Sequence, residues 1–112
     1  MPIANCYIRK EFSEKTNYQQ LVKEWAEALQ ISETDITLNV VMDHKQFGHQ
    51  YPAMINLFLP SLWSETDIEK IQRTLSQLLQ KHLKITSDQL FIMTSIIESG
   101  HVFSDGQMER WD

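Results

Sequence analysis

The chain has few residues that interrupt regular structure, with three glycines and three prolines among 112 residues. No linker is visible, so we expect a single domain over residues 1–112, with halves at about 1–53 and 54–112. The one cysteine, Cys6, cannot form an intramolecular disulfide, which favours a reducing compartment. No run is long and apolar enough to span a membrane, and the signal-peptide pattern is lacking, so we expect a cytoplasmic protein.

Basic residues are outnumbered, with ten Lys and Arg against 15 Asp and Glu and a formal net charge of −5. This excess argues against nucleic acid or an anionic membrane as the main partner. It still permits a small anionic substrate, because a local basic pocket can exist within an acidic protein. Apolar residues make up 42% of the chain, which is typical of globular proteins and argues against disorder.

The sequence lacks the motifs that bind metals and phosphates. The four histidines show no HxH or HExxH spacing, and no glycine-rich phosphate loop or GxSxG motif is present. We therefore expect no metal and no cofactor. Cys6 lies inside an apolar run and is predicted to be a small buried residue rather than a nucleophile.

One pattern occurs twice, and its second copy starts 54 residues after the first. The stretches "LQISETDITL" at 29–38 and "LKITSDQLFI" at 83–92 share a leucine, an isoleucine, a hydroxyl residue, an acid and an apolar run. The same offset aligns Leu21 with Leu75 at the apolar positions of two helical patterns. The chain is therefore predicted to contain two similar halves.

Each half is predicted to contain one helix between two strands. Apolar spacing and capping residues predict helices over 17–29 and 64–83, which begin at Asn17 and Ser64. Runs rich in β-branched and other apolar residues predict strands over 3–8, 36–42, 54–59 and 90–97. Right-handed crossovers then give an α+β fold, in which two β-α-β repeats form a four-stranded mixed sheet with two helices on one face.

The opposite face of this sheet is expected to be apolar and to be buried against other subunits. We expect Ile55, Leu57, Ile92 and Ile96 to fill that shared centre. A short extra strand is expected at 101–103, before a turn at Asp105 and Gly106.

The start "MPIA", the paired repeats and the loops "KQFGHQ" and "SGHVFSDG" resemble the tautomerase superfamily. That superfamily includes 4-oxalocrotonate tautomerase and macrophage migration inhibitory factor. "YPAMINLF" and "SDGQ" look most like a bacterial subfamily of two-repeat proteins of uncharacterised function. The resemblance covers nearly the whole chain and implies a homotrimer, with sites at subunit boundaries near the N-terminal proline.

The resemblance makes Pro2 the candidate catalytic residue. If Met1 is removed, Pro2 becomes a secondary amine, and burial or a nearby cation would lower its pKa from ~8 towards neutral. Such an amine could act as general base in keto-enol proton transfer on a small α-keto acid, as a tautomerase does. If Met1 stays, Pro2 is an amide with no basic lone pair. The alternative is a non-catalytic oligomeric binding or structural protein of the same fold, in which Pro2 only begins a strand.

Five residues are candidates for binding a small-molecule carboxylate substrate. Arg9 could hold the carboxylate with a two-pronged hydrogen bond, and Lys10 is a second possible cation. Tyr51 could donate to a substrate oxygen, while Phe47 or Phe103, in matching loops, could form an apolar wall. Each has a plain alternative, namely a solvated charge for the cations and packing for the aromatic residues.

The chain departs from the family at positions that bind substrate in known members. Thr37 or Leu38 stands where the short tautomerases carry a second arginine. The lysine of migration inhibitory factor falls on Ile31, and its later tyrosine and asparagine fall on Phe91 and Met93. The resemblance therefore does not identify the substrate, nor whether dehalogenation or hydration replaces tautomerisation.

Overall fold

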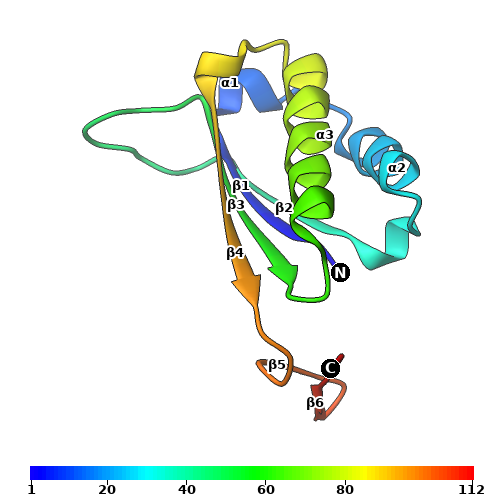
Figure 1. Ribbon diagram of the computed structural model, residues 1–112. Coiled ribbons are helices and arrows are strands. Elements are labelled where there is room, and N and C mark those ends of the chain that lie inside the picture. The colour runs from blue at the N-terminus through cyan, green and yellow to red at the C-terminus, as the bar shows by residue number, and fades with distance from the viewer.

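The computed structural model describes all 112 residues and contains a four-stranded sheet with two long helices on one face (Figure 1). The strands are β1 (Ile3–Ile8), β2 (Thr37–Val41), β3 (Ala53–Pro60) and β4 (Leu90–Ile97), in the order β2-β1-β3-β4. Within each half the two strands run parallel, and β1 and β3 run antiparallel at the centre. The predicted α+β fold with a mixed sheet is confirmed.

The long helices, α2 (Tyr18–Leu29) and α3 (Glu65–Leu83), begin one residue after the predicted caps. The side chains of Asn17 and Ser64 each accept a hydrogen bond from an N–H group of the first turn. No helix is long and apolar enough to cross a membrane. Three shorter turns were not predicted: α1 (Lys10–Ser13) and the 3-10 turns η1 (Glu33–Asp35) and η2 (Ser87–Gln89).

A small hairpin follows the sheet and consists of β5 (Val102–Ser104) and β6 (Gln107–Glu109). Its turn residues Asp105 and Gly106 both have positive φ angles, 51° and 77°, as a tight two-residue hairpin turn requires. The hairpin lies beyond the end of β4, on the same side of the molecule as the N-terminus (Figure 1). The turn was predicted correctly, and the single expected strand is one arm of the hairpin.

The main core lies between the sheet and the two helices. Leu21 and Trp25 of α2 are fully buried there, and so are their predicted repeat partners Leu75 and Leu79 of α3. Trp25 Nε1 also donates a hydrogen bond to Thr74 Oγ1, at 3.2 Å. The weak sequence repeat therefore marks equivalent positions on two helices that share one core.

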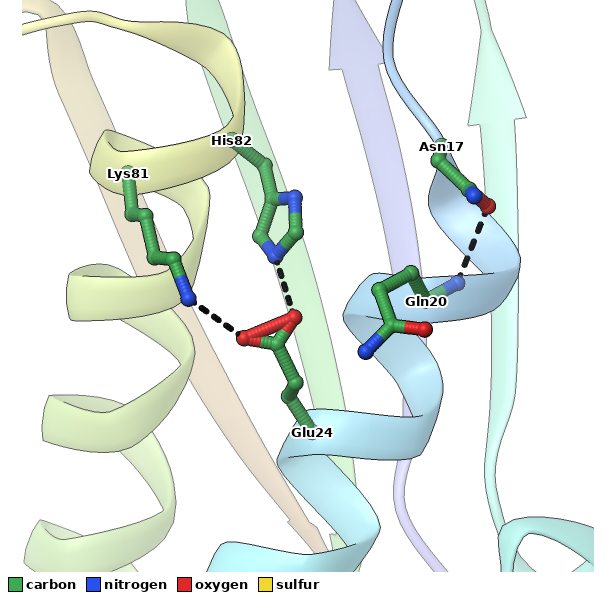
Figure 2. Close-up of polar contacts among 5 residues, drawn as sticks. All are labelled: Asn17, Gln20, Glu24, Lys81 and His82. Atoms are coloured by element: carbon green, nitrogen blue, oxygen red, sulfur yellow. Dashed lines mark hydrogen bonds and ion pairs between the residues drawn. The ribbon is translucent and has the colours of Figure 1, made fainter.

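A polar contact ties the two helices together at the surface. Glu24 on α2 accepts from Lys81 Nζ at 2.7 Å and is paired with His82 Nε2 at 2.8 Å, both on α3 (Figure 2). The hydrogen bond from Lys81, aided by His82, lowers the pKa of the Glu24 carboxyl. These two contacts thus link Glu24 to residues that lie 57 and 58 positions further along the sequence.

The prediction of which residues fill the open face was wrong. Ile55 and Leu57 are fully buried beneath the helices, and Ile92 packs against the same core. Ile96 is paired with the buried Leu59 and so belongs to the same side of the sheet. Side chains alternate between the two faces of a strand, and the open-face set also contains large apolar residues such as Met54 and Phe58, so hydrophobicity alone did not indicate which set is buried. The open face instead carries Ile3, Asn5, Tyr7, Asn39, Met54, Asn56, Phe58, Phe91 and Met93.

Candidate functional site

Pro2 is fully buried at the start of β1. Its carbonyl oxygen accepts a hydrogen bond from the Thr37 N–H, at 3.1 Å, which joins this end of the chain to β2. Because proline has no N–H of its own, its nitrogen leaves no unpaired donor here. The sheet therefore holds the backbone of Pro2 in a fixed place.

A cavity of about 200 Å³ lies beside the amino terminus. Its wall is formed by the ends of β1, β3 and β4 and by the C-terminal segment. Ile3, Phe58, Ile97, Val102 and Trp111 contribute apolar side chains. Met1 also lines it, so removal of Met1 would enlarge the space and open it towards the Pro2 nitrogen.

Hydrogen bonds fix the C-terminal segment against the cavity. Trp111 Nε1 donates to Ser61 Oγ at 2.9 Å, and the Trp111 N–H donates to Ser99 Oγ at 2.9 Å. Ser99 Oγ in turn donates to Asp112 Oδ1 at 2.7 Å. The wall made by Trp111 is therefore tied both to the turn after β3 and to the end of β4.

The charges around the amino terminus are acidic. Burial lowers the pKa of the Met1 amine, whereas the carboxylates of Asp35 and Glu109 raise it. Glu109 is the single charged side chain that lines the cavity. No lysine, arginine or histidine lines it, so within one chain the expected cation is not beside Pro2.

Arg9 and Lys10 follow the opposite end of β1 from the cavity. Arg9 Nη2 donates to Gln50 Oε1 at 3.3 Å. The Lys10 ammonium is exposed and lies 3.7 Å from the Glu14 carboxylate. Within one chain, both cations lie apart from the amino-terminal cavity.

The three aromatic candidates lie in different surroundings. Tyr51 packs against Phe91 and His49, with ring centroids 5.1 and 4.6 Å apart, at the Arg9 end of the sheet. Phe47 is 86% exposed in the loop before β3, and Phe103 is 68% exposed on β5. Phe103 is near the amino terminus in the fold but does not line the cavity. The predicted residues thus form two groups at opposite ends of one sheet.

No protein-family model and no curated protein sequence matches the chain. Solved structures do match it. A member of the cis-3-chloroacrylic acid dehalogenase family has a TM-score of 0.75 at 5% identity, over 96% of this chain and 82% of that one. A fused 4-OT solved as an asymmetric trimer has a TM-score of 0.77 at 14% identity, over 95% and 94%. A macrophage migration inhibitory factor-like protein from Entamoeba histolytica has a TM-score of 0.65 at 15% identity, over 96% and 97%.

The chain has the tautomerase-superfamily fold. This similarity covers the sheet, both helices and nearly the whole length, as the resemblance of the sequence implied. Identities of 5 to 15% establish the fold and leave activity to be argued from the site.

Two acidic residues near the amino terminus were not identified from the sequence. Asp35 lies in η1, and Glu109 lies in β6, more than 70 residues further on. Neither belongs to a motif, and only the closing of the sheet and the hairpin brings them to the amino terminus. Each copy of the sequence repeat contains an acidic residue, but the repeat does not indicate how close that residue lies to Pro2 in the fold.

Other reactive groups of the fold are not arranged for chemistry. Burial raises the pKa of the Cys6 thiol to about 12, which makes it a poor nucleophile. Cys6 is fully buried, as predicted. No group of three or more His, Cys, Asp or Glu side chains is placed to hold a metal ion.

Proposed function

We propose that the protein is a tautomerase-like isomerase in which the Pro2 amine, freed by removal of Met1, is the general base. It would transfer a proton between carbon and oxygen of a small enolisable carbonyl compound, with α-keto acids as the first class to test. The observation that carries the proposal is the place of Pro2 in a tautomerase fold, buried between Met1 and Ile3, which both line the apolar cavity. The similar structures include a member of the cis-3-chloroacrylic acid dehalogenase family and a fused 4-OT, which supports an enzyme of this fold over a purely structural protein.

The chemistry requires a neutral amine. In the conversion of an enol to a ketone, Pro2 would take the proton from the enol hydroxyl and deliver it to the adjacent carbon, so that no atom is gained or lost. Apolar walls favour the neutral amine, because burial disfavours its protonated form. The same burial lowers the pKa of the amine that precedes Pro2 in the unprocessed chain.

We further propose a cytoplasmic homotrimer. The open sheet face carries large apolar side chains, and Met93 is 53% exposed in the single chain. One similar structure is described as an asymmetric trimer. Were the substrate a carboxylate, Arg9 of a second copy would be the candidate to bind it, because Arg9 is distant from Pro2 in its own chain. The buried free thiol of Cys6 suits a reducing compartment.

The test begins with the intact mass of natively produced protein, which reports whether Met1 is removed. Met1-free protein should convert the enol of phenylpyruvate to the ketone, and Pro2→Ala should lower kcat/KM by about 100-fold or more. A matched control is a chain with one glycine before Pro2, which turns the amine into an amide and adds no side chain to the cavity. Circular dichroism should show the same fold in all three proteins.

The proposal fails if Met1-free protein converts no member of a panel of keto acids and their esters. The non-catalytic alternative would then apply, with the apolar cavity as a binding site. Equal activity in the wild type and in the extended chain would show that the Pro2 amine takes no part in the reaction.

A further inference from the structure

We infer that the amino-terminal cavity selects an uncharged, apolar carbonyl compound, and that Glu109 excludes carboxylates from it. The inference rests on the proposed function: it keeps the proton transfer and replaces α-keto acids with uncharged carbonyl compounds as the preferred substrate class. The residue that sets the selection comes from the C-terminal hairpin, which lies outside the two β-α-β repeats.

The size and the walls of the cavity suit one ring with a short side chain. An apolar cavity of roughly 150 Å³ holds a benzene molecule, and this cavity measures about 200 Å³. Phe58 and Trp111 offer flat aromatic surfaces, and Ile97 and Val102 add aliphatic ones. A carboxylate placed here would lose its water and gain no cationic partner, which is costly.

Glu109 places a fixed carboxylate at the wall. Ser104 Oγ donates to Glu109 Oε1 at 2.6 Å, and the Glu109 carbonyl oxygen accepts from the Gly100 N–H at 2.9 Å. The hairpin pairing of Val102 with Glu109 holds the same residue from the backbone. A substrate carboxylate in the cavity would therefore meet a like charge that cannot easily turn away.

No basic side chain of the same chain offsets that charge. Arg110, next in sequence, places its guanidinium over Gly100 and does not line the cavity. Arg9 follows the far end of β1. Asp35 adds a second negative charge that acts on the terminal amine. Within one chain, the charges at this site therefore oppose anions and tolerate neutral ligands.

The experiment compares phenylpyruvate with its methyl ester, which differ only in the charged group. We expect Met1-free protein to favour the ester by about tenfold or more in kcat/KM. Glu109→Gln should reduce that preference, mainly by raising kcat/KM for the acid, and it should move the pH profile of the amine to lower pH. The amide oxygen can still accept from Ser104, so the hairpin should stay folded. Glu98→Gln, which removes an exposed charge outside the cavity, should change neither the preference for the ester over the acid nor the pH profile of the amine.

A binding measurement separates this inference from the proposed reaction. Phenylacetate and its methyl ester are titrated into Pro2→Ala protein and followed by chemical-shift changes at the Trp111 indole N–H. Tighter binding of the ester, with acid affinity recovered in Glu109→Gln, supports the selection even if no turnover is found. A preference for the acid that Arg9→Ala abolishes would overturn it and assign the cation to a second copy. Binding of neither compound would overturn it as well.

Discussion

Glu24 shows how one residue can couple two helices through its charge. Its carboxylate contacts both Lys81 and His82, and its pKa is lowered in the folded protein (Figure 2). A lowered folded-state pKa means that the contact stabilises the fold above the unfolded pKa of ~4.3, and that this stabilisation is lost as pH falls through the folded value.

We therefore predict that Glu24→Gln lowers the Tm at pH 7 and makes the Tm less sensitive to acid. Thermal melts from pH 7 down to pH 3 measure this directly. Glu27→Gln on the exposed face of the same helix is the matched control, because Glu27 makes no ion pair. Identical slopes of Tm against pH for the wild type and Glu24→Gln would show that the pair contributes nothing.

The C-terminal hairpin and tail are the element on which the cavity depends. No residue of 99–112 is fully buried, and Trp111 is held by hydrogen bonds to Ser61 and Ser99. Such attachments open more readily than a packed core, because few buried apolar contacts are lost. The element that carries Glu109 is therefore expected to exchange amide protons faster than β1 or β3.

Trp111→Phe should keep the apolar wall and remove the indole hydrogen bond to Ser61. We expect a loss of about 1 kcal/mol in the stability of this attachment, the usual size for one such bond. Hydrogen exchange of residues 99–112 should speed up, while exchange in β3 stays unchanged. Trp63→Phe is the control, because the Trp63 indole nitrogen has no hydrogen-bond partner. Equal exchange in both variants would contradict the assigned role of the Ser61 bond.

At the scale of the whole molecule, the open sheet face contains a polar row within an apolar surface. Asn39, Asn5 and Asn56 lie side by side on three neighbouring strands, and Asn39 Nδ2 donates to Asn5 Oδ1 at 2.8 Å. Met54 and Phe58 flank the row on β3. A face of this kind can pack against other copies only if the amides find partners there.

Asn56→Asp should therefore shift the proposed trimer towards monomer, because it buries a charge at the centre of the shared face. Light scattering at micromolar protein measures the mass, and circular dichroism checks the fold. Gln77→Glu adds the same charge on the exposed side of α3 and should leave the mass unchanged. A wild type that is monomeric under these conditions would count against the assembly itself.

Sequence alone determined the four strands of the sheet, the two long helices and their order. Apolar spacing, the caps at Asn17 and Ser64, and the two turn residues before β6 act over a few residues, so they can be read locally. The repeat then indicated two equivalent helices, and right-handed crossovers restricted their connection. The place of Pro2 at the start of β1 was also predictable, because it depends only on the neighbouring strand residues.

Tertiary structure alone decided which strand face is buried and which charges meet the amino terminus. Ile55 and Met54 are both apolar, so which of the two is buried depends on the helices that cover one side of the sheet. Glu109 reaches the cavity only because the hairpin folds back beyond β4, and Arg9 is separated from Pro2 by the length of β1. Contacts between residues distant in sequence have no local signature, and the electrostatics of this site arises entirely from such contacts.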